Sequence, residues 1–121
     1  MRGISTTFAE GRYFDLWMVV HFLVGVSGGF SNVLFGLDTL AVFGVGIAIM
    51  VLWEIGEYVA GIREGPMNRV LDVAVGTAGV ALALLTASPF GLGVQRALFG
   101  LSLLLVLGGS ALGWRAYRRR R

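Results

Sequence analysis

The sequence predicts an all-α polytopic membrane protein: a four-helix transmembrane bundle with both termini in the cytoplasm (N-in/C-in). Hydrophobic residues make up 56% of the 121 residues and charged residues only 14%, against about 25% charged residues in a typical soluble domain. The mean hydropathy is +0.80, and glycine occupies 19 positions. Transmembrane helices accept glycine because it lets neighbouring backbones approach closely. We therefore expect one transmembrane domain over residues 1–121, embedded as a multi-pass protein in the bilayer of the cytoplasmic membrane.

Four apolar runs account for most of the chain. Their expected bounds are 13–35, 39–61, 69–88 and 94–114. Each run has about 20 residues, and at about 1.5 Å per residue this length crosses a hydrocarbon core about 30 Å thick. Each run is therefore expected to be a membrane-spanning helix.

Turn residues separate these runs. Asp38 or Thr39 can cap the second helix, because both side chains accept hydrogen bonds from the first free N–H groups of a helix. Gly65-Pro66 breaks the chain between the second and third runs, and Ser88-Pro89 ends the third. The connections are therefore short, and the four helices are expected to be neighbours in one bundle.

Arginine placement sets the expected orientation. Of the ten basic residues, only Arg96 falls in a segment that would lie outside. The other nine fall in the inside segments: Arg2, Arg12, Arg63, Arg69, Arg115, Arg118, Arg119, Arg120 and Arg121. Positive residues favour the cytoplasmic side, so this asymmetry predicts N-in and C-in. We interpret the terminal arginine run as a membrane anchor, and we expect no nucleic-acid partner.

Three of the expected spans carry polar groups that are costly in hydrocarbon. These are His21 in the first, Glu54 and Glu57 in the second, and Asp72 at the start of the third. An ionisable side chain at the bilayer centre costs about 2.5–3.5 kcal/mol on insertion scales. All four lie within roughly 5–12 Å of the inner boundary, at about 1.5 Å per residue. Their common depth predicts one shared pocket between spans one, two and three.

Small residues continue the polar faces. Gly25 lies one turn after His21, and Gly76 lies one turn after Asp72. Small residues on these faces indicate contact with other helices, because a lipid-facing surface has no need of them. In the fourth span, Gly109 and Gly113 are expected to form a notch for helix packing.

One imidazole and three carboxylates are the donors of a hard divalent-cation site. We predict that Glu54, Glu57, Asp72 and His21 bind Mg²⁺, Mn²⁺ or Zn²⁺, or else form a proton relay. Two acids on one helix face repel each other unless a cation or a proton lies between them. The substrate or headgroup contacts are predicted to be Arg63, Arg69 and Asn68. No catalytic residue can be assigned, and the question of enzymatic activity stays open.

Each of these groups also has a local structural interpretation. Asp72 could pair with Arg69 along the helix. Glu57 could meet Arg63 or water at the headgroups. A neutral His21 could donate to a backbone carbonyl within a tight helix contact.

The order of these residues resembles that of the VanZ-like and YjdF-like small membrane proteins. The matching features are a His in an early span, then Trp53-Glu54-x-x-Glu57-Tyr58, and then Asp72 with Gly79 seven residues later. The resemblance covers about two-thirds of the chain. It implies a membrane protein of four or more spans with an acidic site and no settled activity. Gly76 stands where VanZ-like proteins commonly have Asn, and Glu64 and Asn68 stand where YjdF-like members carry further acids.

Three functions remain open at this point. The first is a membrane protein whose divalent-cation site binds or acts on a headgroup-like or polar substrate. The second is a homodimeric proton- or cation-coupled transporter of small molecules, which requires a membrane-embedded glutamate. The third is a structural subunit of a membrane complex. The chain has no cysteine, which excludes thiolate chemistry, and it has no haem or nucleotide motif.

Overall fold

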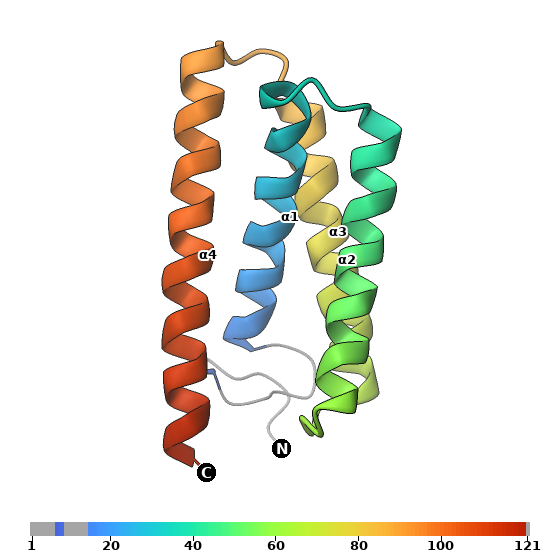
Figure 1. Cartoon of the computed structure of the whole chain (residues 1–121), viewed down its shortest axis with the longest axis vertical. Coiled ribbons are helices and arrows are strands. Elements are labelled where there is room, and N and C mark those ends of the chain that lie inside the picture. Colours follow the sequence, from blue (N-terminus) through green and yellow to red (C-terminus); the bar gives the residue numbers. More distant parts are fainter. Residues whose placement is uncertain (1–6, 9–14, 121) are drawn as a thin grey trace.

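The computed structural model describes residues 7–8 and 15–120, and the helices of this part lie side by side (Figure 1). The helices are α1 (Leu16–Leu34), α2 (Thr39–Val59), α3 (Pro66–Thr86) and α4 (Leu92–Arg120). The described part contains no strand, which confirms the predicted all-α class. α1 contacts each of the other three helices, and α2 also contacts α3. The start of α1, the α2–α3 loop and the end of α4 share one end of the bundle (Figure 1), called here the α2–α3 end.

The helix boundaries follow from local caps. Asp38 accepts a hydrogen bond from the Ala41 N–H at 2.9 Å, as predicted for the start of α2. Asp15 caps α1 by accepting from the Trp17 N–H at 3.0 Å. α3 begins at Pro66 rather than at residue 69, because proline at the first helical position has no N–H to satisfy and its fixed φ suits a helix.

α4 is longer than expected. It continues past residue 114 to Arg120, and arginines occupy its last turn. Cationic side chains stabilise the negative end of the helix dipole, and no glycine or proline follows Trp114 to end the helix there. The arginine run therefore extends the helix at the α2–α3 end.

α1 and α3 approach closely through glycines. A methyl group added to Gly25 would collide with the Gly76 carbonyl oxygen, and one added to Gly79 would collide with the Phe22 carbonyl oxygen. On α4, a methyl group added to Gly113 would lie 2.5 Å from the Trp17 ring, and one added to Gly109 would lie 3.1 Å from the Val20 side chain. The predicted notch on α4 is confirmed, and α1 fills it.

The interior of the described helices mixes polar and apolar side chains, and the exterior carries many large apolar ones. The buried polar or charged side chains are Asp15, His21, Ser27, Glu54, Asn68, Asp72, Gln95 and Ser102. Large apolar side chains are instead exposed, among them Leu40, Val59, Leu85 and Leu104. α2, α3 and α4 are long and apolar enough to cross a membrane, whereas the apolar stretch of α1, Leu16–Asn32, is shorter. These features indicate a membrane protein.

Candidate metal site

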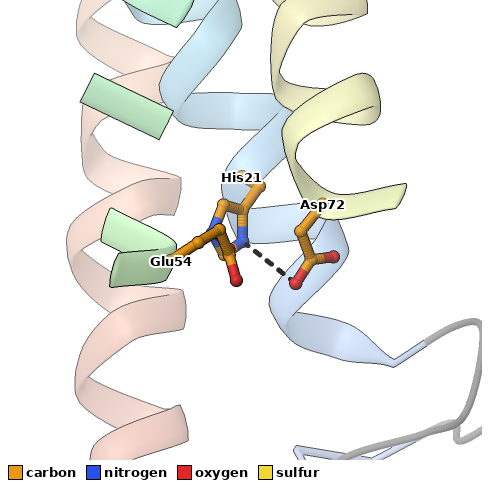
Figure 2. Close-up of side chains that lie close together, drawn as sticks. All are labelled: His21, Glu54 and Asp72. Carbon is orange, nitrogen blue, oxygen red and sulfur yellow. Dashed lines mark ion pairs between the residues drawn. The ribbon is translucent and has the colours of Figure 1, made fainter. Parts of the chain in front are cut away.

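Three side chains from three helices meet near the α2–α3 end (Figure 2). His21 of α1 lies between Glu54 of α2 and Asp72 of α3, and their exposed fractions are 2%, 7% and 0%. His21 Nε2 lies 3.2 Å from Glu54 Oε1, and His21 Nδ1 lies 3.9 Å from Asp72 Oδ2. One ligand atom from each residue lies within 4.8 Å of the other two. Three of the four predicted metal ligands therefore share one buried cluster.

The backbone of α1 determines which nitrogen of His21 carries hydrogen. His21 Nδ1 lies 2.8 Å from the Trp17 carbonyl oxygen one turn earlier. A carbonyl can only accept, so Nδ1 is the N–H that donates. In a neutral ring, Nε2 then has a lone pair and faces the Glu54 carboxylate. The predicted contact of His21 with a backbone carbonyl is confirmed, and it also suits a metal site, because metal-bound histidines usually donate their other N–H in this way.

The carboxylates of Glu54 and Asp72 have no hydrogen-bond donor in the described part of the chain. All four of their oxygens are buried, and none accepts a hydrogen bond there. Asp72 does not use Arg69, whose Nε lies 3.5 Å from Glu64 Oε2 and whose Nη2 donates to the Ile62 carbonyl. The local interpretation of Asp72 as a partner of Arg69 is therefore wrong. Buried charges of this kind need a counter-charge.

Glu57 belongs to a second, adjoining group. Glu54, Glu57 and Glu64 each offer an oxygen within 4.8 Å of the other two. Glu57 Oε1 accepts a hydrogen bond from Trp53 Nε1 at 2.7 Å, which orients it without Arg63. Glu54 thus belongs to both groups, and Glu57 adjoins the cluster of His21, Glu54 and Asp72 because it lies beside Glu54.

Asn68 links Glu64 to the cap of α1. Its amide nitrogen donates to Asp15 Oδ2 at 3.1 Å and to Glu64 Oε1 at 2.5 Å. Asn68 is fully buried, and the headgroup contact by this side chain stays a prediction. Its place on the inner face of α3 turns it toward the two acids.

Glu64 lies in the α2–α3 loop with its side chain only 3% exposed. Burial is the main reason that the pKa of Glu64 is raised to about 7, and the negative charge of Glu54 also raises it. The hydrogen bond from Asn68 lowers the pKa but does not offset burial. Glu64 therefore changes charge near neutral pH in the absence of a bound cation.

The two predicted headgroup arginines line one groove at the α2–α3 loop. A cavity of about 590 Å³ is lined by Tyr58, Gly61, Ile62, Arg63, Glu64, Gly65 and Arg69. Arg63 is exposed. The Arg69 guanidinium lies 5.1 Å from the centre of the Tyr58 ring, which holds it by a cation–π contact. Glu64 lines this groove and also belongs to the second acidic group.

Asp15 and Glu64 were not among the predicted site residues. Asp15 stands directly before an apolar run, which is the sequence pattern of an N-cap. Glu64 stands four residues before Asn68, a spacing that brings side chains together on a helix or at its start. Both signals are local, and neither indicates that the residue turns toward the cluster.

Comparisons of the chain with protein-family models, with curated proteins and with solved structures give no match. The resemblance to VanZ-like and YjdF-like proteins therefore stays a prediction. The function has to be argued from the geometry of the site.

Proposed function

We propose that this protein is a four-span, N-in/C-in membrane protein that holds a divalent cation between His21, Glu54 and Asp72 near the cytoplasmic face. The 19 residues of α1 extend about 29 Å at about 1.5 Å per residue, close to the hydrocarbon thickness of about 30 Å. An even number of spans agrees with the shared end of α1 and α4 (Figure 1). The arginine asymmetry makes that end cytoplasmic.

The contact between His21 and Glu54 carries the proposal. With Nδ1 donating to Trp17, a neutral His21 ring and the Glu54 carboxylate are two acceptors that face each other at 3.2 Å, which is unfavourable unless something positive binds both. Two adjacent ligands at about 2.0–2.2 Å from one cation are about 3.0–3.5 Å apart. The observed separation fits that geometry. Asp72, whose two oxygens accept no hydrogen bond from the described residues, supplies the third ligand.

The donor set indicates the class of cation. Two carboxylates and one imidazole suit Mg²⁺, Mn²⁺ or Zn²⁺. The adjacent groove, with Arg63 and Arg69 in its lining, supports an anionic ligand, and a phosphate group of a lipid headgroup has the matching charge. The protein is thus proposed to bind or act on a phosphate-bearing headgroup.

Metal analysis of the purified protein tests the cation. We expect about one equivalent or more of a divalent metal per chain in the wild type and a clear loss in Glu54→Gln. The matched control is Asp38→Asn, an acid at the opposite end of the bundle whose cap function asparagine retains. Wild-type protein that stays metal-free after dialysis against Mg²⁺, Mn²⁺ and Zn²⁺ would contradict the proposal.

A proton between His21 and Glu54 is the second candidate, because a 3.2 Å separation also fits a charge-assisted hydrogen bond. This favours the homodimeric proton-coupled transporter. Glu54→Gln would then keep or raise thermal stability, because it removes a buried acid, and would abolish proton-coupled transport. If neither the metal content, the stability nor any transport changes, the structural-subunit hypothesis is the one left.

The headgroup can be tested separately. Titration of the purified protein with short-chain phosphatidic acid should show weaker binding for Arg63→Gln than for wild type. The control is Arg96→Gln, which removes an exposed arginine at the opposite end of the bundle. If both substitutions weaken binding of the phosphatidic acid equally, the effect is one of overall charge, and the proposed headgroup contact by Arg63 is contradicted.

A further inference from the structure

We infer that Glu54, Glu57 and Glu64 form a second cation site that shares Glu54 with the first, so that the protein holds a two-cation centre. This rests on the proposed function and extends it. One oxygen from each of the three glutamates lies within 4.8 Å of the other two. Glu54 belongs to both groups of ligands, which is the position of a bridging carboxylate.

The bridging role follows from the surroundings of Glu54. Its Oε1 faces His21 Nε2, and its Oε2 is also buried without a hydrogen bond in the described part of the chain. The side chain is only 8% exposed. A carboxylate that uses one oxygen for each of two cations satisfies both buried acceptors, whereas a single cation on Oε1 leaves Oε2 unsatisfied.

A small cavity lies against the second group. It measures about 10 Å³ and is lined by Trp17, Glu57, Ile62, Glu64, Trp114 and Tyr117. That is about the size needed for one water molecule or one ion. Two of the lining residues are the carboxylates of the second group, and the remaining walls are mainly aromatic and apolar. The cavity thus offers an ion-sized space where the negative charge is concentrated.

Neighbouring donors hold the outer ligands in place. Trp53 Nε1 donates to Glu57 Oε1, and the Asn68 amide donates to Glu64 Oε1. Each bond uses one oxygen and orients the carboxylate, as the Trp17 carbonyl orients His21. Such outer contacts are the usual support of metal ligands. Each of the two groups therefore has an oriented ligand.

The charge of the combined centre allows a second cation. The four carboxylates of the combined centre carry four negative charges, and Arg69, beside Glu64, offsets one of them. One divalent cation leaves a net charge of about −1, and two leave about +1. A small positive charge beside the groove of Arg63 and Arg69 suits a phosphate that bridges both ions, as in other two-cation sites with ions about 3.5–4 Å apart. The ligand class is therefore a phosphate monoester or diester.

The number of bound Mn²⁺ ions tests this inference. The purified full chain in detergent is titrated with Mn²⁺, and bound ion is counted by equilibrium dialysis and electron paramagnetic resonance. We expect two ions per wild-type chain and a spin-coupled signal from the pair. Glu64→Gln and Glu57→Gln should each retain one ion and lose the coupling. Asp72→Asn should also retain at most one, and Glu54→Gln should weaken both.

The outcomes separate the two proposals. One ion per wild-type chain that is lost in Asp72→Asn but kept in Glu64→Gln and Glu57→Gln would overturn the second site and leave the first. No bound Mn²⁺ in the wild type would overturn both. Asp38→Asn should bind as the wild type does. Size-exclusion elution and far-ultraviolet circular dichroism establish that each variant is folded. Glu57→Gln on α2 and Glu64→Gln in the α2–α3 loop test the second site independently, so that misfolding of one variant still leaves the other as a test.

Discussion

The side chain of Asn68 joins two acids that come from different parts of the chain. Asp15 precedes α1, and Glu64 precedes α3, and both accept from the same amide nitrogen. The three groups are buried together, so the amide is the donor that makes the burial of these oxygens tolerable. Asn68 therefore stabilises the end of the bundle that contains the candidate site.

Asn68→Ala should lower the free energy of unfolding by about 1–3 kcal/mol, because it removes a donor that two buried carboxylates share. Thermal unfolding in detergent measures this. The control is Thr86→Ala, which removes an exposed hydroxyl that bonds only within its own helix in the described structure. An Asn68→Ala protein as stable as the control variant would show that the link is unimportant.

Glu64 gives the site a pH dependence. Its folded-state pKa is raised to about 7, mainly by burial, so the folded protein binds this proton more tightly than the unfolded chain does. The stability that this proton contributes to the folded state is fully present below the unfolded pKa, near 4.5. It is lost as the pH rises through the folded pKa of about 7. In metal-free protein kept in chelator, wild type should therefore lose stability relative to Glu64→Gln over that range.

Melting temperatures of the two proteins at matched pH values measure the difference. The metal-free condition matters because a bound cation would compete with the proton for the same carboxylate. A difference between wild type and variant that stays constant from about pH 5 to about pH 8 would contradict the raised pKa.

The contact between α1 and α3 is the element that fixes the distance between His21 and Asp72. Gly25 lies one turn after His21, and Gly76 lies one turn after Asp72, and these glycines leave no room for a side chain between the helices. Met50 of α2 packs over Gly76, where an added methyl group would lie 2.7 Å from its sulfur. The small residues therefore set the helix spacing on which the site depends.

Gly25→Ala should destabilise the protein by about 1–3 kcal/mol, the usual cost of overfilling a tight contact. Gly44→Ala is the matched control, because nothing lies within 4 Å of an added methyl group there. Alanine is the better helix former, so this control should be neutral or gain about 0.5–1 kcal/mol. Equal melting temperatures for the two variants would contradict the close packing of α1 on α3.

Much of this element-level arrangement was predictable from the sequence. Apolar run lengths and the turn residues Asp38 and Pro66 located the four helices to within a few residues, except at the end of α4. The common depth of His21, Glu54 and Asp72 correctly predicted that they meet. Depth and spacing do not specify rotamers or donors, so the loop residue Glu64 and the cap Asp15 were missed, and the buried direction of Asn68 was not foreseen.

At the scale of the whole molecule, the described surface is rich in large apolar side chains, unlike that of a soluble protein, and polar groups lie among the buried side chains. Polar groups occupy the contacts between helices, as Ser27 and Ser102 do with a hydroxyl-to-hydroxyl bond of 2.7 Å between α1 and α4. Leucines and valines face outward on α2 and α4. An apolar outer surface suits contact with hydrocarbon, and hydrogen bonds between helices satisfy part of the polar interior.

The orientation of the whole chain in the membrane can be tested with reporter fusions. A reporter fused after Arg121 should read the cytoplasmic side, and one inserted in the loop 87–91 should read the external side, because nine of the ten arginines lie in the segments assigned inside. A reporter in the α2–α3 loop, beside Arg63, serves as the internal reference for the cytoplasmic side. An external signal from the C-terminal fusion would contradict the proposed orientation and the cytoplasmic position of the site.

The nitrogen coupling of bound Mn²⁺ tests the cation site most directly, because His21 is the single histidine of the chain. Electron spin-echo modulation of the Mn²⁺-loaded protein should show coupling to ¹⁴N of one imidazole, and His21→Gln should abolish it while carboxylate-bound Mn²⁺ remains detectable. This is the result expected if His21 Nε2 and Glu54 share a cation. Bound Mn²⁺ without any nitrogen coupling in the wild type would place the ion elsewhere and contradict the proposed site.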